Sequence, residues 1–368
     1  DSLLTPDYSL LIFMHHLLVI GLGKVGSLVG VLLSQRFQVT GFDQNQPAQP
    51  VPFPVVTGSV SDEKTLKKLL SDADGVVSCL PYSLNLPVAR LAHQLGKHYF
   101  DLTEDVPTTN AIREMAATGS RAVLAPQCGL APGFIGIVGA DLAKKFTRLR
   151  DIELRVGALP AHPNGLLGYS FTWSPAGVIN EYLNDCEVIH NGQRKWVPAL
   201  EGIEQINIEG QEFEAFSTSG GLGTLCETYE GKVDTLNYKT IRYPGHGRLM
   251  RFLLYELILK DDRKRVEEIL TVAKPPVQED VVYVYAVVEG WKGERLEREE
   301  FYRAYRPRRI DDQRWRAISW TTAASLVAVV EMVANEQLPQ TGFLKQEDVP
   351  LDAFLQTRTG GWFERQEP

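Results

Sequence analysis

The chain has 368 residues, of which 44% are hydrophobic and 23% are charged, and its formal net charge is −8. This length suits two domains, and the composition is that of a globular protein, which excludes extensive disorder and collagen-like structure. The acidic balance also argues against nucleic-acid binding, because the richest basic stretch, Arg303–Arg309, stands beside Asp311 and Asp312.

The first 145 residues alternate between short apolar strands and amphipathic helices. We expect strands at Leu17–Ile20, Gln38–Phe42, Val55–Val56, Gly75–Leu80, Tyr99–Leu102 and Ala122–Ala125. We expect helices from the glycine turn to about Arg36, then at Ser61–Leu70 with Ser61 as N-cap, Leu86–Leu95, Ala111–Thr118 and Phe134–Phe146. This alternation predicts an α/β, Rossmann-like, doubly wound parallel sheet with right-handed crossovers, over residues 14–130.

The pattern changes near Arg150, where strands of period two begin. We expect strands at Ile152–Val156, Glu187–Ile189, Lys195–Val197, Gln205–Ile208 and Val281–Val288, with a hairpin turn at Asn191-Gly192 and another at Trp291–Gly293. Helices are expected at Pro175–Leu183, Arg248–Leu259 and Val266–Ala273. The pattern predicts a second, α+β domain over residues 131–312, whose mainly antiparallel sheet carries helices on one face. The long apolar helix Trp315–Asn335 resembles the first domain, so we expect residues 313–368 to return to it.

Residues 21–26, GLGKVG, match the GxGxxG pattern of dinucleotide-binding turns. The pattern alone is weak, but here it follows an apolar strand and opens a helix, as the motif requires. Gly21 allows the tight turn, Gly23 lets the backbone approach a pyrophosphate, and Gly26 lets helix and strand pack closely. Lys24 and Val25 belong to the same turn, where the N-terminus of the helix attracts phosphates. The alternative is a glycine turn without a ligand.

A carboxylate follows the second strand at Asp43, about twenty residues after the glycines. It would accept hydrogen bonds from ribose hydroxyls and repel a 2′-phosphate, and no arginine follows directly, so the sequence favours NAD over NADP. Asp62 would reach the adenine or serve as an ordinary acidic first-turn residue. Ligands of such sheets bind at the carboxyl ends of the strands, so three loops should approach the nicotinamide: Leu80-Pro81-Tyr82, Thr103–Asp105 and Gln127–Gly133.

Several segments carry a family resemblance: GLGKVG (21–26), SCLPYSLNLPVARLA (78–92), YFDLTED (99–105), APQCGLAPGFIG (125–136), LGYSFTWSPAGVINEY (167–182), FSTSGGLGTL (216–225) and KTIRYPGH (239–246). On these segments the chain resembles the saccharopine dehydrogenase superfamily, and within it most closely the lysine 6-dehydrogenases. The resemblance implies a Rossmann-like domain, a substrate domain, and redox chemistry at a carbon–nitrogen bond of an amino acid or polyamine. Saccharopine-forming enzymes typically carry an aspartate in a GLDPG segment where this chain has Ala131, which favours the lysine-dehydrogenase branch.

Oxidation of a C–N carbon requires a neutral amine. The ammonium form has an ordinary pKa near 10 and is protonated at neutral pH, so the site needs a base or a desolvating pocket to remove the proton. Glu104 and Asp105, beyond the fifth strand, are the candidate bases; capping of a helix before Pro107 is the alternative. Tyr82 would hydrogen-bond beside the nicotinamide ribose, or pack as a plain ring. Cys128 lies in a family-specific loop, and we expect it to contact cofactor or substrate rather than act as a nucleophile.

The second domain offers four candidate substrate-binding residues. Arg242 is the first choice for a substrate α-carboxylate, because a guanidinium fork pairs with a carboxylate. Lys239 and His246 stand in the same motif, although His246 is also placed to open a helix near Arg248. Trp173 lies in the segment that resembles the family's substrate side, with a core anchor as the alternative.

These residues lead to one main hypothesis and two alternatives. The main one is an NAD-dependent dehydrogenase of the lysine 6-dehydrogenase type that acts on a small amino-acid substrate; the others are a saccharopine- or carboxyspermidine-type reductase using NADPH, and a dinucleotide-binding sensor without turnover.

Four separated cysteines without a CxxC pair and histidines without a ligand pattern predict a cytoplasmic protein without disulfides or metal. The apolar run Tyr8–Met14 lacks the features of a signal peptide, so we expect residues 1–13 to be a leader, and no segment reaches the roughly 20 apolar residues of a membrane span. We also expect a homodimer.

Overall fold

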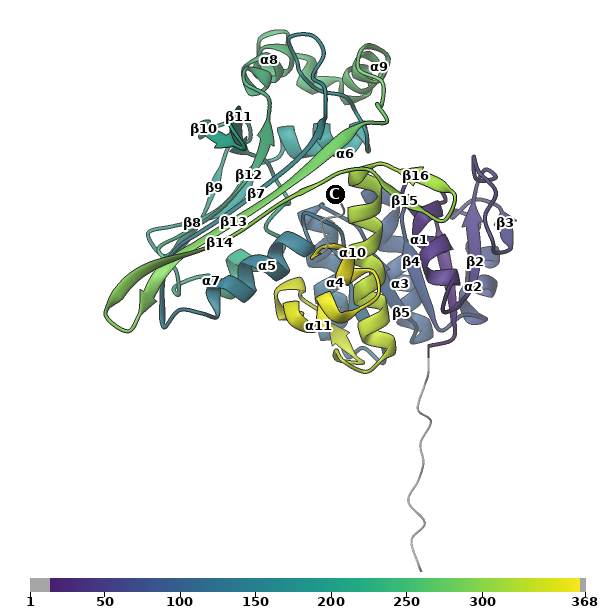
Figure 1. Cartoon of the computed structure of the whole chain (residues 1–368). Helices are drawn as coiled ribbons and strands as arrows, with labels where there is room; N and C mark the ends of the chain where they lie inside the picture. Colours follow the sequence, from purple (N-terminus) through teal and green to yellow (C-terminus); the bar gives the residue numbers. More distant parts are fainter. Residues whose placement is uncertain (1–13, 365–368) are drawn as a thin grey trace, which may run out of the picture.

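The computed structural model describes residues 14–364, so the expected leader, residues 1–13, lies outside the described part. One sheet of seven parallel strands has the order β17-β6-β5-β4-β1-β2-β3 (Figure 1). Six of its strands come from the first part of the chain: β1 (His16–Ile20), β2 (Gln38–Asp43), β3 (Val55–Thr57), β4 (Gly75–Ser78), β5 (His98–Asp101) and β6 (Val123–Ala125). The predicted doubly wound sheet is confirmed, and its strand order reverses between β1 and β4, where such sheets bind ligands.

Helices cover both faces of this sheet. On one face α2 (Glu63–Ser71), α3 (Asn85–Leu95) and α4 (Val106–Ala117) bury Leu66, Val88 and Ile112 in a common apolar cluster. On the other face α1 (Gly26–Ser34) packs against a helix from the C-terminal part of the chain, α10 (Ala317–Ala334). Both faces of the sheet are therefore buried, which explains why the sequences of its strands are continuous apolar runs.

Two helices of this domain begin at other residues than expected. Asp62, and not Ser61, caps α2, because its carboxylate accepts hydrogen bonds from Thr65 N at 3.2 Å and Thr65 Oγ1 at 2.6 Å. Helix α4 begins at Val106, five residues before the expected Ala111. Asp105 caps it, and Pro107 is tolerated in the first turn, where its missing N–H would have no partner.

The second sheet has eight strands and lies beside the first domain (Figure 1). Its strands are β7 (Arg148–Pro160), β8 (Cys186–His190), β9 (Gln193–Val197), β10 (Glu204–Ile208), β11 (Gln211–Ser217), β12 (Thr235–Arg242), β13 (Asp280–Lys292) and β14 (Arg295–Tyr305). The expected hairpin turn forms at Asn191-Gly192, both with positive φ, between β8 and β9. The sheet is mainly antiparallel as expected, but β12 and β7 pair in parallel, and β11 and β12 were not predicted.

Four helices accompany the second sheet: α6 (Pro175–Leu183), α7 (Leu225–Tyr229), α8 (His246–Arg251) and α9 (Arg263–Ala273). Helix α6 has the predicted bounds, and it packs against α9 over an apolar cluster that includes Val178 and Val266. The single helix expected over Arg248–Leu259 is wrong. The chain instead leaves α8 through a π-turn at Phe252–Glu256 and a left-handed residue at Ile258.

The chain then returns to the first domain. A small hairpin, β15 (Arg308–Ile310) and β16 (Gln313–Trp315), leads into α10, and β17 (Gly342–Phe343) adds to the first sheet beside β6. Asp280, at the start of β13, caps α10 by accepting from Ala317 N at 2.7 Å and Ile318 N at 3.0 Å. Helix α10 is long and apolar enough to cross a membrane, but 89% of it is buried inside the protein, where it forms part of the core.

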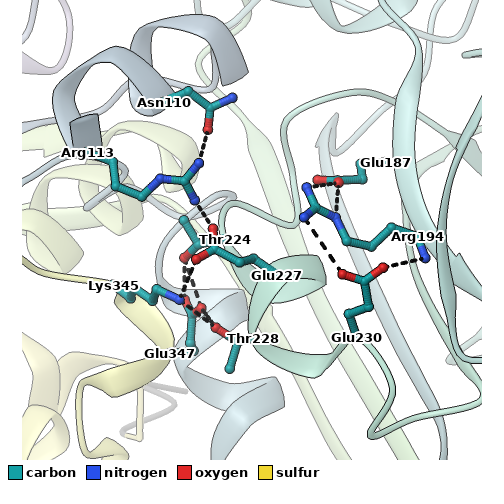
Figure 2. Close-up of polar contacts among 10 residues, drawn as sticks. All are labelled: Asn110, Arg113, Glu187, Arg194, Thr224, Glu227, Thr228, Glu230, Lys345 and Glu347. Atoms are coloured by element: carbon teal, nitrogen blue, oxygen red, sulfur yellow. Dashed lines mark hydrogen bonds and ion pairs between the residues drawn. The ribbon is translucent and has the colours of Figure 1, made fainter. Parts of the chain in front are cut away.

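The two domains share one continuous apolar core. Leu28 of α1, Leu326 of α10, Phe134 of α5 (Phe134–Ala143) and Val284 of β13 all belong to it. A cluster of polar side chains adds hydrogen bonds and ion pairs to the contact between the two domains (Figure 2). Its members come from three parts of the chain: Arg113 of α4 pairs with Glu227 of α7, and Lys345 Nζ lies 3.3 Å from Glu227 Oε1. Beside them Glu347 accepts hydrogen bonds from the hydroxyls of Thr224 and Thr228. The C-terminal helix α11 (Leu351–Gln356) follows.

Candidate functional site

The glycine turn between β1 and α1 has the geometry of a phosphate-binding turn. Gly21 has φ +85°, and a Cβ there would lie 2.8 Å from Cys79 O, at the end of β4. A Cβ on Gly26 would lie 1.7 Å from Gly21 O, so only glycine allows helix and turn to approach this closely. Gly23 differs, because a Cβ there would meet nothing within 4 Å. Its surface is open to a ligand, as the motif predicts for the residue that faces a pyrophosphate.

Asp43 ends β2 beside this turn. Its Oδ2 accepts a hydrogen bond from Leu22 N at 2.6 Å and its Oδ1 one from Asn45 N at 2.9 Å. A carboxylate accepts about four hydrogen bonds, so capacity for two ribose hydroxyls remains. Asp62, the other carboxylate expected at the adenosine, is fully exposed and is the N-cap of α2. The structure gives Asp62 a helix-capping role, and its contact with the adenine stays a prediction.

An open cleft of about 680 Å³ adjoins the turn, within the size range of small-molecule sites. Its lining comes from four parts of the chain: the glycine turn (Leu22, Gly23, Lys24, Ser27), the proline-rich loop (Ala48, Gln49), Gln278 just before β13, and β16 with the start of α10 (Gln313, Arg314, Trp315, Arg316, Ser319). Partial burial and the charge of Arg316 lower the pKa of Lys24. Two cations held together beside open glycine backbone fit the phosphates of a dinucleotide. Arg316 stands in no motif, so the sequence analysis missed it.

The loops after β4 and β5 lie at the carboxyl ends of the parallel strands, as we expected from the sequence. Leu80 N is 3.2 Å from the position of a Gly21 Cβ, so the Leu80-Pro81 segment borders the glycine turn. Tyr82 opens a short 3-10 turn with its ring half-buried, and its contact with the cofactor stays a prediction. Asp101, which the sequence analysis did not single out, is fully buried at the end of β5. It accepts hydrogen bonds from Thr103 N, Gln127 N and Tyr99 Oη, and so fixes two of the three loops.

Glu104 and Asp105, adjacent in the chain, have different environments. Asp105 Oδ2 accepts from Thr108 N at 2.9 Å and Thr108 Oγ1 at 2.6 Å, so the structure gives it the capping role and not that of a base. Burial raises the pKa of Glu104 to about 7, and the charges of Asp105 and Asp101 act in the same direction. A carboxylate with a pKa near 7 is poised to exchange a proton at neutral pH. Of the two candidates, Glu104 has the properties of a base.

Cys128 does not face the cleft. Its side chain is fully buried, its Sγ lies 3.1 Å from Ala125 O, and it receives a hydrogen bond from Gln346 Nε2 at 3.4 Å. Burial raises the pKa of the thiol far above its ordinary value. The expectation that Cys128 contacts cofactor or substrate is therefore wrong, because the thiol joins the loop after β6 to the C-terminal segment.

Arg242 and its neighbours form a buried group at the end of β12. The guanidinium donates from Nε to Tyr182 Oη at 2.9 Å and from Nη1 to Ile241 O at 2.9 Å, and it lies 4.6 Å above the ring of Tyr169. His246 Nδ1 lies 2.9 Å from Leu167 O, so it donates there, and Nε2 accepts from Tyr182 Oη at 3.0 Å. His246, which begins α8, thus holds Tyr182 and does not itself face a substrate.

Lys239 is not part of this group. Residues three apart on a strand point to opposite faces, so Lys239 and Arg242 of β12 diverge. Lys239 Nζ lies 2.5 Å from Glu204 Oε2, a carboxylate that also pairs with Arg155. The predicted substrate contact of Lys239 is wrong, because β12 is a strand on which Lys239 points away from Arg242 and pairs with Glu204.

Helix α6 brings the two halves of the site together. A Cβ on Gly177 would lie 3.2 Å from Glu104 Oε1 and 2.6 Å from the ring of Trp173. The indole of Trp173 is half-buried and donates to Tyr169 Oη at 3.2 Å, so it packs between Glu104 and the Arg242 group. One turn beyond Gly177 stands Glu181, a buried carboxylate that the sequence analysis missed. Desolvation and the charge of Glu104 raise its pKa, and the charge of Arg242 opposes this.

Comparisons with known proteins agree with this architecture. Residues 17–124 match the family model of the saccharopine dehydrogenase NADP-binding domain, and residues 129–358 match that of the saccharopine dehydrogenase C-terminal domain. The fold is similar to that of apo saccharopine dehydrogenase (L-Glu forming) from Saccharomyces cerevisiae, with a TM-score of 0.74 at 16% identity over 93% of this chain and 97% of that one. A second similar fold is the DAP dehydrogenase of C. glutamicum, with a TM-score of 0.51 at 12% identity over 97% of this chain and 100% of that one.

Two relatives are similar in sequence. Saccharopine dehydrogenase [NADP(+), L-glutamate-forming] of Schizosaccharomyces pombe is 29% identical over 206 residues, which are 53% of this chain and 45% of that protein. Alpha-aminoadipic semialdehyde synthase of Arabidopsis thaliana is 27% identical over 208 residues, which are 53% of this chain and 19% of that protein. The chain thus matches less than half the length of either relative. The matches support a nicotinamide dinucleotide, but they do not support the expected preference for NAD, since the matched model and the first relative are described with NADP. With both of its domains matched by the family's models, the chain belongs to the saccharopine dehydrogenase family.

Proposed function

We propose that this protein is a nicotinamide-dependent dehydrogenase that oxidises the C–N bond of an amino acid, as a lysine 6-dehydrogenase does. The observation that carries the proposal is the arrangement around α6. Near the start of this helix the position of a Gly177 Cβ lies 3.2 Å from Glu104 Oε1, and near its end Tyr182 Oη accepts a hydrogen bond from Arg242 Nε at 2.9 Å, so a candidate base from the first domain and a candidate carboxylate receptor from the second lie along one helix. A small zwitterionic substrate fits between a carboxylate and a guanidinium.

Each of these side chains has a separate role in the proposed reaction. Arg242, held by Tyr182 and by the ring of Tyr169, binds the α-carboxylate of the substrate. Glu104 takes the proton of the reacting ammonium, because its pKa of about 7 leaves it ionised at mildly alkaline pH. Trp173 excludes water from this space. The bound nicotinamide supplies the hydride acceptor. Water then adds to the oxidised carbon, and ammonia leaves.

For the cofactor we propose NAD. Asp43 stands at the end of β2, and no lysine or arginine occurs among residues 44–57 to bind a 2′-phosphate. If this is right, Asp43→Ala lowers the affinity for NAD about tenfold or more, and raises the affinity for NADP relative to NAD. Titration of cofactor fluorescence with both dinucleotides measures this. An Asp43→Ala variant that keeps the wild-type ratio of the two affinities would reject the assignment.

The reaction is tested by following cofactor reduction at 340 nm with a panel of amino acids and polyamines, and with both NAD and NADP. Turnover with a diamino acid in the oxidative direction supports the proposal. Turnover only in reverse, when an amine and an aldehyde are supplied with NADPH, would favour a saccharopine-type reductase, which the names of the relatives favour. Cofactor binding without turnover in either direction would leave only a binding protein. The homodimer and the cytoplasmic location remain predictions.

A further inference from the structure

Glu181 has the features of a binding residue whose partner is a ligand. It lies on α6 with 8% of its surface exposed, and among the residues that the structure describes no hydrogen-bond donor or cation lies within bonding distance of its carboxylate. Its backbone, in contrast, is fixed, because Glu181 O accepts from Ser219 N at 3.0 Å. Buried carboxylates normally have partners, since their desolvation is costly. An unpaired, buried carboxylate on a helix whose backbone is fixed therefore calls for a cation from outside.

The position of Glu181 on the helix places it between the two groups assigned above. Gly177 and Glu181 are four residues apart and so lie on one face of α6, a turn apart. The Gly177 end of this face contacts the Glu104 carboxylate, with 3.2 Å between Oε1 and the position of a Gly177 Cβ. At the Glu181 end, the next residue of the helix, Tyr182, accepts a hydrogen bond through Oη from Arg242 Nε at 2.9 Å. The order along the site is therefore Glu104, Glu181, Arg242.

Arg242 does not neutralise Glu181 by direct pairing. Its Nε and Nη1 donate to Tyr182 and to the backbone of Ile241, and its plane lies over the ring of Tyr169. The guanidinium is thus held in one orientation with Nη2 left for a ligand. A carboxylate and a guanidinium that lie close but unpaired match the two charges of an α-amino acid, whose ammonium and carboxylate are joined through one carbon.

We propose that Glu181 binds the α-ammonium group of the substrate while Arg242 binds its α-carboxylate, so that the site selects an α-amino acid whose second, distal amine reaches Glu104. The inference rests on the proposed function and adds the residue that recognises the α-amine of the substrate. Glu181 is the specificity-determining residue, because it separates such a substrate from an otherwise equal one that lacks the α-amine.

Three related compounds test this: L-lysine, 6-aminohexanoate, which lacks the α-amine, and cadaverine, which also lacks the carboxylate. The wild type should prefer lysine. Glu181→Gln should lower kcat/KM for lysine about 10- to 100-fold, the value of a charged hydrogen bond, and leave 6-aminohexanoate nearly unchanged. Arg242→Ala, the matched control, should impair lysine and 6-aminohexanoate alike and spare cadaverine. Isothermal titration of the same compounds as ligands gives a second readout, and Glu181→Asp, which keeps the charge, should retain part of the preference if Glu181→Gln fails to fold.

The outcomes separate the two proposals. If the wild type reduces neither cofactor with any of the three compounds, the proposed function fails. If the wild type oxidises lysine, but Glu181→Gln loses as much with 6-aminohexanoate as with lysine, the proposed function stands and the assignment of Glu181 is wrong.

Discussion

Glu104 is the residue whose environment makes the sharpest prediction about activity. Burial raises its pKa to about 7, and only the ionised form accepts a proton. The value of kcat/KM should therefore rise with pH through about 7 and level off above it. Glu104→Gln should lower kcat/KM about 100-fold or more at pH 8 and remove this titration. A pH profile of the two proteins measures both effects.

Asp105 provides the control for that experiment. Its carboxylate caps α4, so Asp105→Ala should cost about 1 kcal/mol of stability; it should keep the titration of Glu104 but move it to lower pH, because the charge of Asp105 helps to raise the pKa of Glu104. If Asp105→Ala abolished the titration near pH 7 and Glu104→Gln did not, the roles of the two carboxylates would be reversed.

The same raised pKa has a consequence for stability. The folded-state value of about 7 lies above the ordinary 4.5, so between these pH values the folded protein keeps a proton that the unfolded chain releases. The contribution of Glu104 to stability is thus fully present below about pH 4.5 and is lost as the pH rises towards 7. Glu104→Gln is neutral at every pH, so its melting temperature relative to the wild type should increase from pH 5 to pH 8. A difference that is constant with pH would contradict the raised pKa.

Among the structural elements, the glycine turn makes a prediction through two neighbouring glycines. A Cβ at Gly23 meets no protein atom, whereas a Cβ at Gly26 would overlap Gly21 O. Gly23→Ala should therefore leave the melting temperature of the cofactor-free protein unchanged and weaken dinucleotide binding about tenfold or more, because the methyl group occupies the approach of the pyrophosphate. Gly26→Ala should lower the melting temperature itself. Thermal melts with and without cofactor separate the two, and equal behaviour of both variants would argue against a dinucleotide at this turn.

At this scale the sequence predicted some elements well and others not at all. The first domain was predictable because its strands are continuously apolar and its helices are amphipathic, and α6 because Ser174 and Pro175 mark its start. Strand β12 was missed because its charged residues, Lys239 and Arg242, stand in a motif that suggested a ligand site. That error placed Lys239 beside Arg242. Glu181 and Arg316 were missed because their roles depend on contacts between distant segments, and nothing local in the sequence marks them.

At the scale of the whole molecule, the first domain is discontinuous in sequence. Helix α10 covers the sheet face next to α1, and β17 completes its edge. A fragment of residues 14–147 should therefore bind the dye ANS and unfold without cooperativity, because the core residues that face α10 are exposed. Joining residues 313–364 to it through a flexible Gly/Ser linker should reduce the dye binding and restore a cooperative transition. Equal dye binding by both fragments would show that α10 is not required.

The late position of α10 also matters during synthesis. About 190 residues separate the end of β6 from the start of α10, and ribosomes add about 5–20 residues per second, so the sheet emerges roughly 10–40 s before the helix that covers it. During that interval the apolar face beside α1 has no cover of its own. The nascent chain therefore passes through a state that holding chaperones recognise, and the second domain has time to fold before the first one is complete.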